Sequence, residues 1–152
     1  MVCLGNICRS PMAEGVLRKK LSEKGIEAEV DSAGTSNYHV GEKPDERAIA
    51  CAARHGVDLK SLRARQFRPE DFDRFDRIFV MDLANYSDVI SLARTPADRE
   101  KVDLLLHVSF PDTNMEVPDP YFGGDSGFEK VYLLLDNACG LLAEGIQKTS
   151  KL

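Results

Sequence analysis

Strand-like and helix-like stretches alternate along this chain from one end to the other, and this alternation limits the possible folds. Short apolar or alternating stretches of the kind typical of strands occur at residues 26–34, 77–82 and 102–108. Stretches with helical spacing of apolar residues occur at 10–25, 44–56, 83–93 and 128–148. Because this order favours βαβ units, we predict an α/β fold with a central, mainly parallel sheet and helices on both faces. No repeat or linker divides the pattern, so we expect one domain over residues 1–152.

Length, charge and cysteine content exclude several classes of protein. With 152 residues, the chain can bury about 70% of its unfolded surface without disulfides. The formal charge of −5, from 25 acidic and 20 basic side chains, argues against a nucleic-acid partner. Four cysteines do not suggest a disulfide scaffold, no secretion segment starts the chain, and no apolar stretch approaches the roughly 18 residues that span a bilayer. We therefore expect a cytoplasmic protein with reduced cysteines and no membrane partner.

The opening stretch "MVCLGNICRSP" combines a thiol and a guanidinium with the start of a predicted helix. Cys3 and Arg9 are separated by five residues, and backbone N–H groups of such a loop and of a helix start can bind an oxyanion. The same positive field favours a thiolate nucleophile at Cys3, while Arg9 can hold two phosphoryl oxygens. Gly5 and Asn6 suit unusual backbone angles. We expect Ser10 to cap the helix, and its hydroxyl could also donate to the Cys3 sulfur.

Other interpretations of this stretch stay open on the residues alone. Zinc could be bound by Cys3, Cys8, Cys51 and His55, the last two being one helical turn apart. A permanent Cys3–Cys8 disulfide does not suit a reducing cell, although a reversible one could protect oxidised Cys3. A cysteine and an arginine at this spacing also occur together by chance.

A second stretch, "EVPDPYFGG", supplies an acid in a stiff loop. Asp119 lies between two prolines and is followed by two glycines. Cleavage of a phosphate ester by a thiolate expels an alkoxide or phenoxide, which needs a proton donor. Asp119 is therefore the candidate general acid, and Tyr121 can form an aromatic wall beside it.

Taken together, "VCLGNICRSP", "DSAGTS", "RARQF", "FVMD" and "VPDPYFGG" resemble the low-molecular-weight protein tyrosine phosphatases over essentially the whole length. The resemblance implies a three-layer domain with a four-stranded sheet. It also implies hydrolysis of phosphotyrosine or aryl phosphates through a phosphocysteine. Phosphotyrosine-containing proteins would be the partners, inorganic phosphate would be the product, and no cofactor or catalytic metal would be needed.

The resemblance also assigns roles to individual residues. Cys3 would be the nucleophile, Arg9 the phosphate-binding side chain and Asp119 the general acid and then base. The remaining roles are the phosphate loop of Leu4, Gly5, Asn6, Ile7, Cys8 and Arg9; the supporting Ser10, Ser32 and Asp82; and the pocket walls Ile7, Tyr38 and Tyr121. Cys8 would be the redox partner of Cys3. Isoleucine at position 7 favours phosphotyrosine, because the phosphoarginine branch of this fold typically has threonine there. Cys51 and Cys139 are interpreted as small core residues.

One departure from the family pattern concerns the start of the sheet. Only Met1 and Val2 precede Cys3, whereas the family places an apolar strand of about six residues there, a usual strand length. We therefore expect the first strand to be largely missing and one end of the phosphate loop to be unanchored. An N-terminal fragment would explain this. So would the alternative function that we consider, a non-catalytic phosphate- or zinc-binding module.

Overall fold

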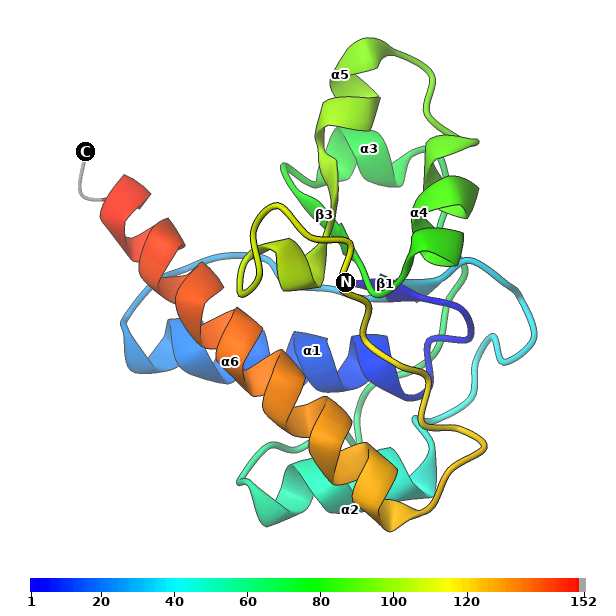
Figure 1. Ribbon diagram of the computed structural model, residues 1–152, viewed down its shortest axis with the longest axis vertical. Helices are drawn as coiled ribbons and strands as arrows, with labels where there is room; N and C mark the ends of the chain where they lie inside the picture. Colours follow the sequence, from blue (N-terminus) through cyan, green and yellow to red (C-terminus); the bar gives the residue numbers. More distant parts are fainter. Residues whose placement is uncertain (151–152) are drawn as a thin grey trace.

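The computed structural model describes residues 1–150, so positions 151 and 152 of the predicted domain lie outside the described residues. Strands and helices alternate as predicted (Figure 1). Their bounds are β1 Val2–Cys3, α1 Arg9–Glu23, β2 Ala33–Gly34, α2 Glu46–Arg54, α3 Asp71–Arg74, β3 Ile78–Val80, α4 Leu83–Ile90, α5 Pro96–Glu100, β4 Val102–Leu104, the 3-10 turn η1 Leu105–His107, and α6 Asp125–Ser150.

All pairs of neighbouring strands in the sheet are parallel, and the strand order is β2-β1-β3-β4. Val2 of β1 lies between Ala33 of β2 and Val80 of β3. On the outer side of β3, Ile78 is in register with Val102 of β4. The prediction of an α/β fold with a parallel four-stranded sheet is therefore confirmed.

Strand β1 is short, but it lies in the centre of the sheet and its end is held on both sides. The Thr35 N–H donates to the carbonyl of Cys3 at 2.9 Å, and the Met81 N–H donates to the carbonyl of Val2 at 3.1 Å. The expectation of an unanchored phosphate loop is therefore wrong. Two residues are sufficient here because β2 and β3 each extend the hydrogen bonding past the end of the strand.

The other strands are shorter than their apolar stretches predict. In the predicted strand 26–34 only Ala33 and Gly34 pair with a neighbouring strand, and residues 26–32 form no strand. In the predicted strand 102–108, pairing ends at Leu104 and a 3-10 turn follows. Apolar patterning indicates burial, whereas strand pairing also requires a neighbouring strand that extends alongside the same residues.

Two hydrophobic clusters cover the two faces of the sheet. Alternate residues of β3 point to opposite faces, so Phe79 joins one cluster, whereas Ile78 and Val80 join the other. The first cluster packs against α1, α2 and α6, and the second against α3 and α4, which gives three layers (Figure 1). Helix α6 packs along α1 and also contacts α2. Within residues 1–150, no helix combines the length and the apolar character needed to cross a membrane.

Helix α6 offers a matched pair of leucines to test its core face. Leu135 is fully buried in the first cluster, whereas Leu133 on the same helix is 55% exposed. We expect Leu135→Ala to lower the free energy of unfolding by about 2–5 kcal/mol, because it removes buried methyl groups and leaves a cavity. Leu133→Ala should change it by no more than about 0.5 kcal/mol. Urea unfolding followed by circular dichroism measures both, and similar losses in the two variants would contradict the assigned core face.

Candidate active site

The loop between β1 and α1 wraps around the sulfur of Cys3, at the carboxyl end of the central strand. Cys3 is buried, and its Sγ lies 3.0 Å from Ser10 Oγ and 3.3 Å from the backbone nitrogen of Asn6, whose N–H donates to it. Both groups can donate hydrogen bonds to the sulfur. The arrangement gives Cys3 the surroundings expected of a nucleophile.

The first turn of α1 is left open for an anion. Its N-cap residue, Cys8, makes no side-chain capping bond, and no acidic residue lies in the first turn. The prediction that Ser10 caps the helix is therefore wrong, because Ser10 lies inside the first turn and its hydroxyl faces Cys3 and Asn6. Free N–H groups at a helix start bind oxyanions, so the missing cap is consistent with a phosphate site.

Asn6 holds the loop in shape. Its φ of 56° lies in the left-handed region, where asparagine is one of the few tolerated residues with a side chain. Its Nδ2 donates to Ser10 Oγ at 2.8 Å and to Ser32 Oγ at 2.9 Å, and its Oδ1 accepts from the Arg65 N–H at 3.0 Å. The predicted supporting roles of Ser10 and Ser32 therefore correspond to direct contacts with this residue.

A buried carboxyl group extends this network behind the loop. The Ser32 hydroxyl donates to Glu14 Oε1 at 2.6 Å, and Arg18 pairs with Glu14 Oε2 at 2.7 Å. Burial raises the pKa of Glu14, against the opposing effects of the Ser32 hydrogen bond and of Arg18. The sequence analysis missed Glu14 because a single acid on a predicted helix resembles any surface acid.

Arg9 is buried and aimed by two acids. Its Nη1 donates to Asp82 Oδ2 at 2.7 Å and to the carbonyl of Val117 at 3.0 Å, while its Nη2 lies 3.5 Å from Asp119 Oδ2. Burial opposes the charge of Arg9, but Cys3, Asp82 and Asp119 outweigh burial and raise its pKa. With Nη1 occupied and the Asp119 contact long, Nη2 is the nitrogen best placed to meet an incoming oxyanion.

Asp82 holds Arg9 on one side and the start of a helix on the other. Besides pairing with Arg9, it caps α4, since its Oδ1 accepts from the Asn85 N–H at 2.7 Å and Asn85 Oδ1 accepts from the Asp82 N–H at 3.2 Å. A side chain fixed from one side by a helix start can orient a guanidinium on the other side.

The acid loop, residues 117–124, is fastened to the phosphate loop by Arg47. The Arg47 guanidinium donates to the carbonyls of Tyr121 at 2.9 Å and Gly123 at 3.1 Å. Arg47 is itself bound by the carboxylate of Asp45, and the Asp45 N–H donates to the carbonyl of Ile7 at 2.8 Å. The sequence analysis missed this connection because it joins three segments that are distant in the chain.

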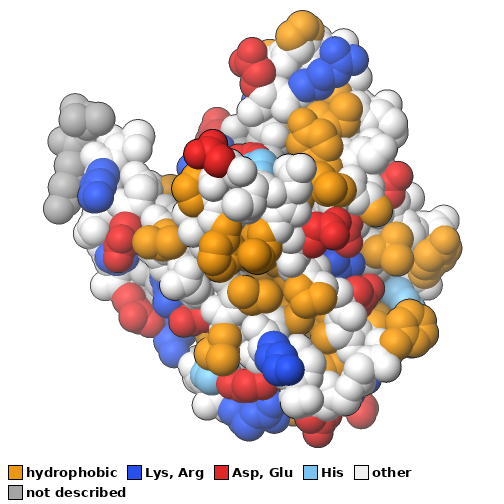
Figure 2. Space-filling view, viewed as in Figure 1, with side chains coloured by type: hydrophobic (Ala, Val, Ile, Leu, Met, Phe, Trp, Pro, Cys, Tyr) orange, Lys and Arg blue, Asp and Glu red, His pale blue; other side chains and the backbone are white. Residues whose placement is uncertain are grey.

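One pocket contains the reactive groups and aromatic walls. Asp119 is 40% exposed on its side chain, and its Oδ1 accepts from the Tyr121 N–H at 3.0 Å. The pocket is lined by Cys3, Leu4, Gly5, Ile7, Cys8, Arg9, Tyr38, His39, Asp119, Tyr121 and Phe122. It thus brings together the predicted catalytic residues and walls, and adds His39 and Phe122. Figure 2 shows hydrophobic side chains at the centre and at the right-hand edge of this face, with acidic and basic side chains mixed along its lower edge.

Two glycines, Gly34 and Gly5, lie where a side chain would collide with a neighbouring group. A Cβ on Gly34 would lie 2.8 Å from the carbonyl oxygen of Leu4 and 3.2 Å from the backbone nitrogen of Asn6, so β2 can approach the loop only without a side chain there. Gly5 was expected to need an unusual backbone angle, but its φ is not positive. A Cβ there would instead meet the ring of His39 at 3.0 Å.

The cysteines do not form the zinc site considered above. Across residues 1–150, one group of three or more histidine, cysteine or acidic side chains brings its donor atoms within 4.8 Å of one another, and it comprises Cys51, His55 and Glu129. Because Cys3 and Cys8 are not in this group, the proposed four-residue zinc set is wrong. Cys139 is fully buried in the first cluster, as predicted for a core residue.

Comparison with known proteins connects this geometry to a family. A family model described as low molecular weight phosphotyrosine protein phosphatase matches residues 1–152. The human low molecular weight phosphotyrosine protein phosphatase is 41% identical over 146 residues, covering 94% of this chain and 91% of the human protein. The Bacillus subtilis low molecular weight protein-tyrosine-phosphatase YfkJ is 39% identical over 153 residues, covering 99% of this chain and 96% of YfkJ.

Solved structures agree with the sequence relatives. A protein tyrosine phosphatase from Entamoeba histolytica superposes with a TM-score of 0.90 at 36% identity, covering 99% of this chain and 96% of that one. Wzb of Vibrio vulnificus, solved in complex with benzylphosphonate, superposes with a TM-score of 0.85 at 31% identity, covering 95% of this chain and 94% of Wzb. The fold, the site and the relatives lead to one conclusion, that this chain belongs to the low molecular weight phosphotyrosine protein phosphatase family.

Proposed function

We propose that this chain hydrolyses phosphotyrosine and other aryl phosphate monoesters through a phosphocysteine formed on Cys3. The observation that carries the proposal is the shared pocket of Cys3, Arg9 and Asp119, with a helix start left uncapped beside it. No cofactor is needed for the steps below, because the chain supplies the nucleophile, the anion site and the acid.

Substrate binding depends on positive groups at the floor of the pocket. N–H groups of the loop from Leu4 to Arg9, the start of α1 and the guanidinium of Arg9 bind the three terminal phosphoryl oxygens. Because the guanidinium is planar, it can follow these oxygens as the phosphorus becomes trigonal bipyramidal. The groups that stabilise the transition state are therefore in place before the substrate binds.

The first chemical step transfers the phosphoryl group to the enzyme. The Cys3 thiolate attacks phosphorus, a P–S bond forms and the P–O bond to the phenol breaks. Asp119, in its protonated form, gives its proton to the leaving phenolate oxygen, which departs as a neutral phenol. The hydrogen bonds from Arg47 to the carbonyls of Tyr121 and Gly123 support this role, because they restrain the loop that carries the acid.

The second step restores the enzyme. Asp119, now a carboxylate, takes a proton from water as the water oxygen attacks phosphorus, and the P–S bond breaks. Ser10, 3.0 Å from the sulfur, donates a hydrogen bond to the departing thiolate of Cys3. Inorganic phosphate then leaves the pocket.

The pocket walls support an aromatic substrate. Ile7, Tyr38 and Tyr121 line the pocket together with Phe122, which suits the faces of a phenyl ring. The related Wzb is solved with benzylphosphonate, an aryl-containing phosphate analogue. We therefore propose phosphotyrosine-containing proteins as partners, with Tyr38 and Phe122, which are 74% and 93% exposed, free to contact the surrounding peptide.

A non-catalytic binding module has less support. Its main argument was a phosphate loop without an anchoring strand, and β1 lies between two partner strands. Its zinc-binding form required Cys3 and Cys8 as ligands, which do not join Cys51 and His55.

We also propose Cys8 as the redox partner of Cys3. Both are buried free thiols of the same loop. Burial, and then the charges of Asp45 and Cys3, raise the pKa of Cys8, which keeps it protonated while Cys3 acts as nucleophile. When hydrogen peroxide oxidises Cys3 to a sulfenic acid, the Cys8 sulfur attacks the Cys3 sulfur, a disulfide forms and water leaves.

The four cysteines, Cys3, Cys8, Cys51 and Cys139, are free thiols, which supports a reducing, cytoplasmic location.

Replacing the nucleophile tests the proposed reaction. We expect Cys3→Ser to lower the turnover of phosphotyrosine by about 10⁴-fold or more, because a serine hydroxyl at this position is a poor nucleophile. The variant should still bind inorganic phosphate in a titration calorimeter, since the anion site is intact. Cys139→Ala, which removes a different buried thiol, should keep its activity. Turnover that survives Cys3→Ser would refute the proposed nucleophile.

Replacing the acid tests the proton transfer. Asp119→Asn should lower turnover by about 10²–10⁴-fold for tyrosine phosphate, whose phenolate needs a proton. The loss should be smaller for an aryl phosphate with a nitrophenolate leaving group, which departs without one. Asp112→Asn, in the same long loop, is the matched control and should have no effect. Equal losses with both substrates would exclude Asp119 as the general acid.

Oxidation and recovery test the role of Cys8. After brief exposure to hydrogen peroxide, the unaltered chain should regain most of its activity with a dithiol, because the disulfide stops further oxidation of Cys3. Cys8→Ser should recover little, since the sulfenic acid goes on to irreversible states. Cys51→Ser is the matched control. Equal recovery of Cys8→Ser and the unaltered chain would contradict the proposed pair, and mass spectrometry of the Cys3 peptide reports the oxidation state directly.

A further inference from the structure

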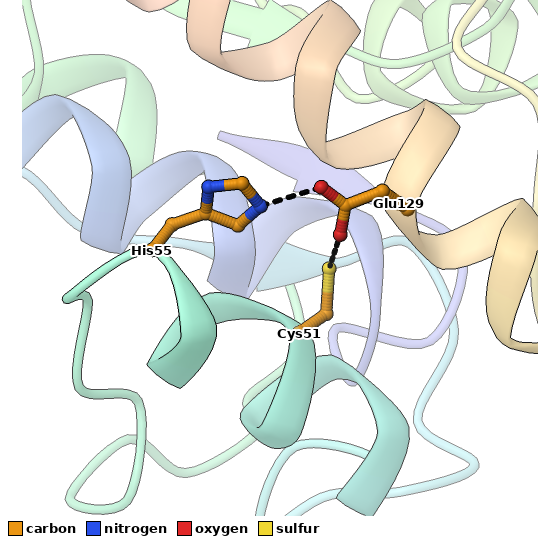
Figure 3. A group of neighbouring side chains, drawn as sticks. All are labelled: Cys51, His55 and Glu129. Atoms are coloured by element: carbon orange, nitrogen blue, oxygen red, sulfur yellow. Dashed lines mark hydrogen bonds and ion pairs between the residues drawn. The ribbon is translucent and has the colours of Figure 1, made fainter.

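A second group of reactive side chains lies where α2 faces α6. Figure 3 shows Cys51 projecting from α2, His55 from the residue that directly follows α2, and Glu129 from α6, so that the three side chains converge. The Cys51 thiol donates to Glu129 Oε2 at 3.4 Å, and His55 Nε2 lies 2.6 Å from Glu129 Oε1. None of the three lines the active-site pocket, and the proposed phosphatase reaction uses none of them.

The convergence follows from the packing of the two helices. Residues four apart on a helix lie on one face, so Cys51 and His55 both point at α6. The thiol is fully buried, whereas the side chains of His55 and Glu129 are 32% and 37% exposed. The group is therefore buried at Cys51 and open to solvent at His55 and Glu129. The open side gives an ion access and leaves room for a water ligand.

The donor set matches a particular class of ion. One sulfur, one imidazole nitrogen and one carboxylate oxygen are the ligand types of zinc, which binds sulfur at about 2.3 Å and oxygen or nitrogen at about 2.0–2.2 Å. Tetrahedral angles at these lengths separate sulfur from oxygen by about 3.5 Å, close to the 3.4 Å between Cys51 Sγ and Glu129 Oε2. All three donor atoms lie within 4.8 Å of one another, so small side-chain rotations bring them around one ion.

We propose that Cys51, His55 and Glu129 bind one Zn²⁺, with water as the fourth ligand, and that the ion links α2 to α6. The site is separate from the phosphate loop and does not depend on the proposed function. Its role is structural, because α2 and α6 carry none of the proposed catalytic residues.

Neighbouring groups place the ligands in advance. The ring of His55 is stacked on Tyr132, with centroids 4.1 Å apart and an interplanar angle of 11°, which fixes its orientation. Arg54 competes for the carboxylate, since its Nη2 lies 3.6 Å from Glu129 Oε2. The Arg54 side chain is 54% exposed, so it can turn to solvent when the ion binds. A surface ion pair of this kind is weak and does not prevent binding.

Zinc binding requires the thiolate. Burial, and then the hydrogen bond to Glu129, raise the pKa of Cys51 to about 11, so the thiol keeps its proton while no ion is bound. On binding, this proton leaves to solvent and the Cys51 sulfur becomes an anionic ligand. His55 binds through Nε2 and keeps its proton on Nδ1.

The test measures metal binding in a variant of the chain that lacks the nucleophile, Cys3→Ser, so that Cys3 cannot bind the metal as a thiolate. In the Cys3→Ser background, Zn²⁺ is titrated in competition with a chromophoric chelator, and Co²⁺ is used as a spectroscopic substitute. We expect one ion per chain and a thiolate-to-cobalt charge-transfer band. Adding Cys51→Ala should abolish the band, whereas Cys139→Ala, which also removes a fully buried thiol, should keep it.

A second pair of variants tests the ligand on α6. Glu129→Gln should weaken Zn²⁺ binding by about tenfold or more, whereas Glu144→Gln, an exposed acid on the same helix, should leave it unchanged. With the nucleophile restored, Cys51→Ala and Glu129→Gln should hydrolyse aryl phosphate normally in metal-free buffer, which shows that they fold. No binding at micromolar Zn²⁺, or a cobalt band that survives Cys51→Ala, would overturn the proposal.

Discussion

The left-handed conformation of Asn6 is the constraint on which the catalytic loop depends. Its backbone N–H donates to Cys3 Sγ, its side-chain Nδ2 donates to Ser10 and Ser32, and its side-chain Oδ1 accepts from the Arg65 N–H. One residue thus ties the end of β1 and the first turn of α1 to Ser32, just before β2, and to Arg65, in a distant part of the chain. A residue at φ 56° costs backbone energy, and these hydrogen bonds offset that cost while holding the loop open for an anion.

Electrostatics at the site is local and does not follow the net charge of −5. A buried guanidinium faces two carboxylates that fix its direction, and Cys3 and these carboxylates outweigh burial and raise its pKa. The uncapped start of α1 adds positive potential beside the nucleophile. Because Asp82 also caps α4 and Asp119 lies on a loop held by Arg47, each charge is positioned by a different part of the fold. Moving any one segment would therefore disturb the anion site.

How much could be predicted depends on how far apart the interacting residues lie. The nucleophile, the arginine and the acid could be predicted, since each lies in a short motif of distinctive composition, and the pocket brings Cys3, Arg9 and Asp119 together. The capping role of Ser10 was predicted wrongly because a serine before a helix usually caps it. Here the sulfur and Asn6 occupy its hydroxyl instead. Strand lengths were overestimated because apolar patterning does not say where a partner strand ends.

The sequence by itself determined the α/β class, the alternation of elements and the chemistry at the two loops, because these are written in local spacing and residue type. Only the tertiary structure decided what lies behind and beside the loop: Glu14 under Ser32, the close approach of Gly34, and the Asp45–Arg47 link to the acid loop. It also replaced a mistaken zinc set with a different cluster across α2 and α6. Such contacts join residues separated by tens of positions, and packing alone fixes which of them meet.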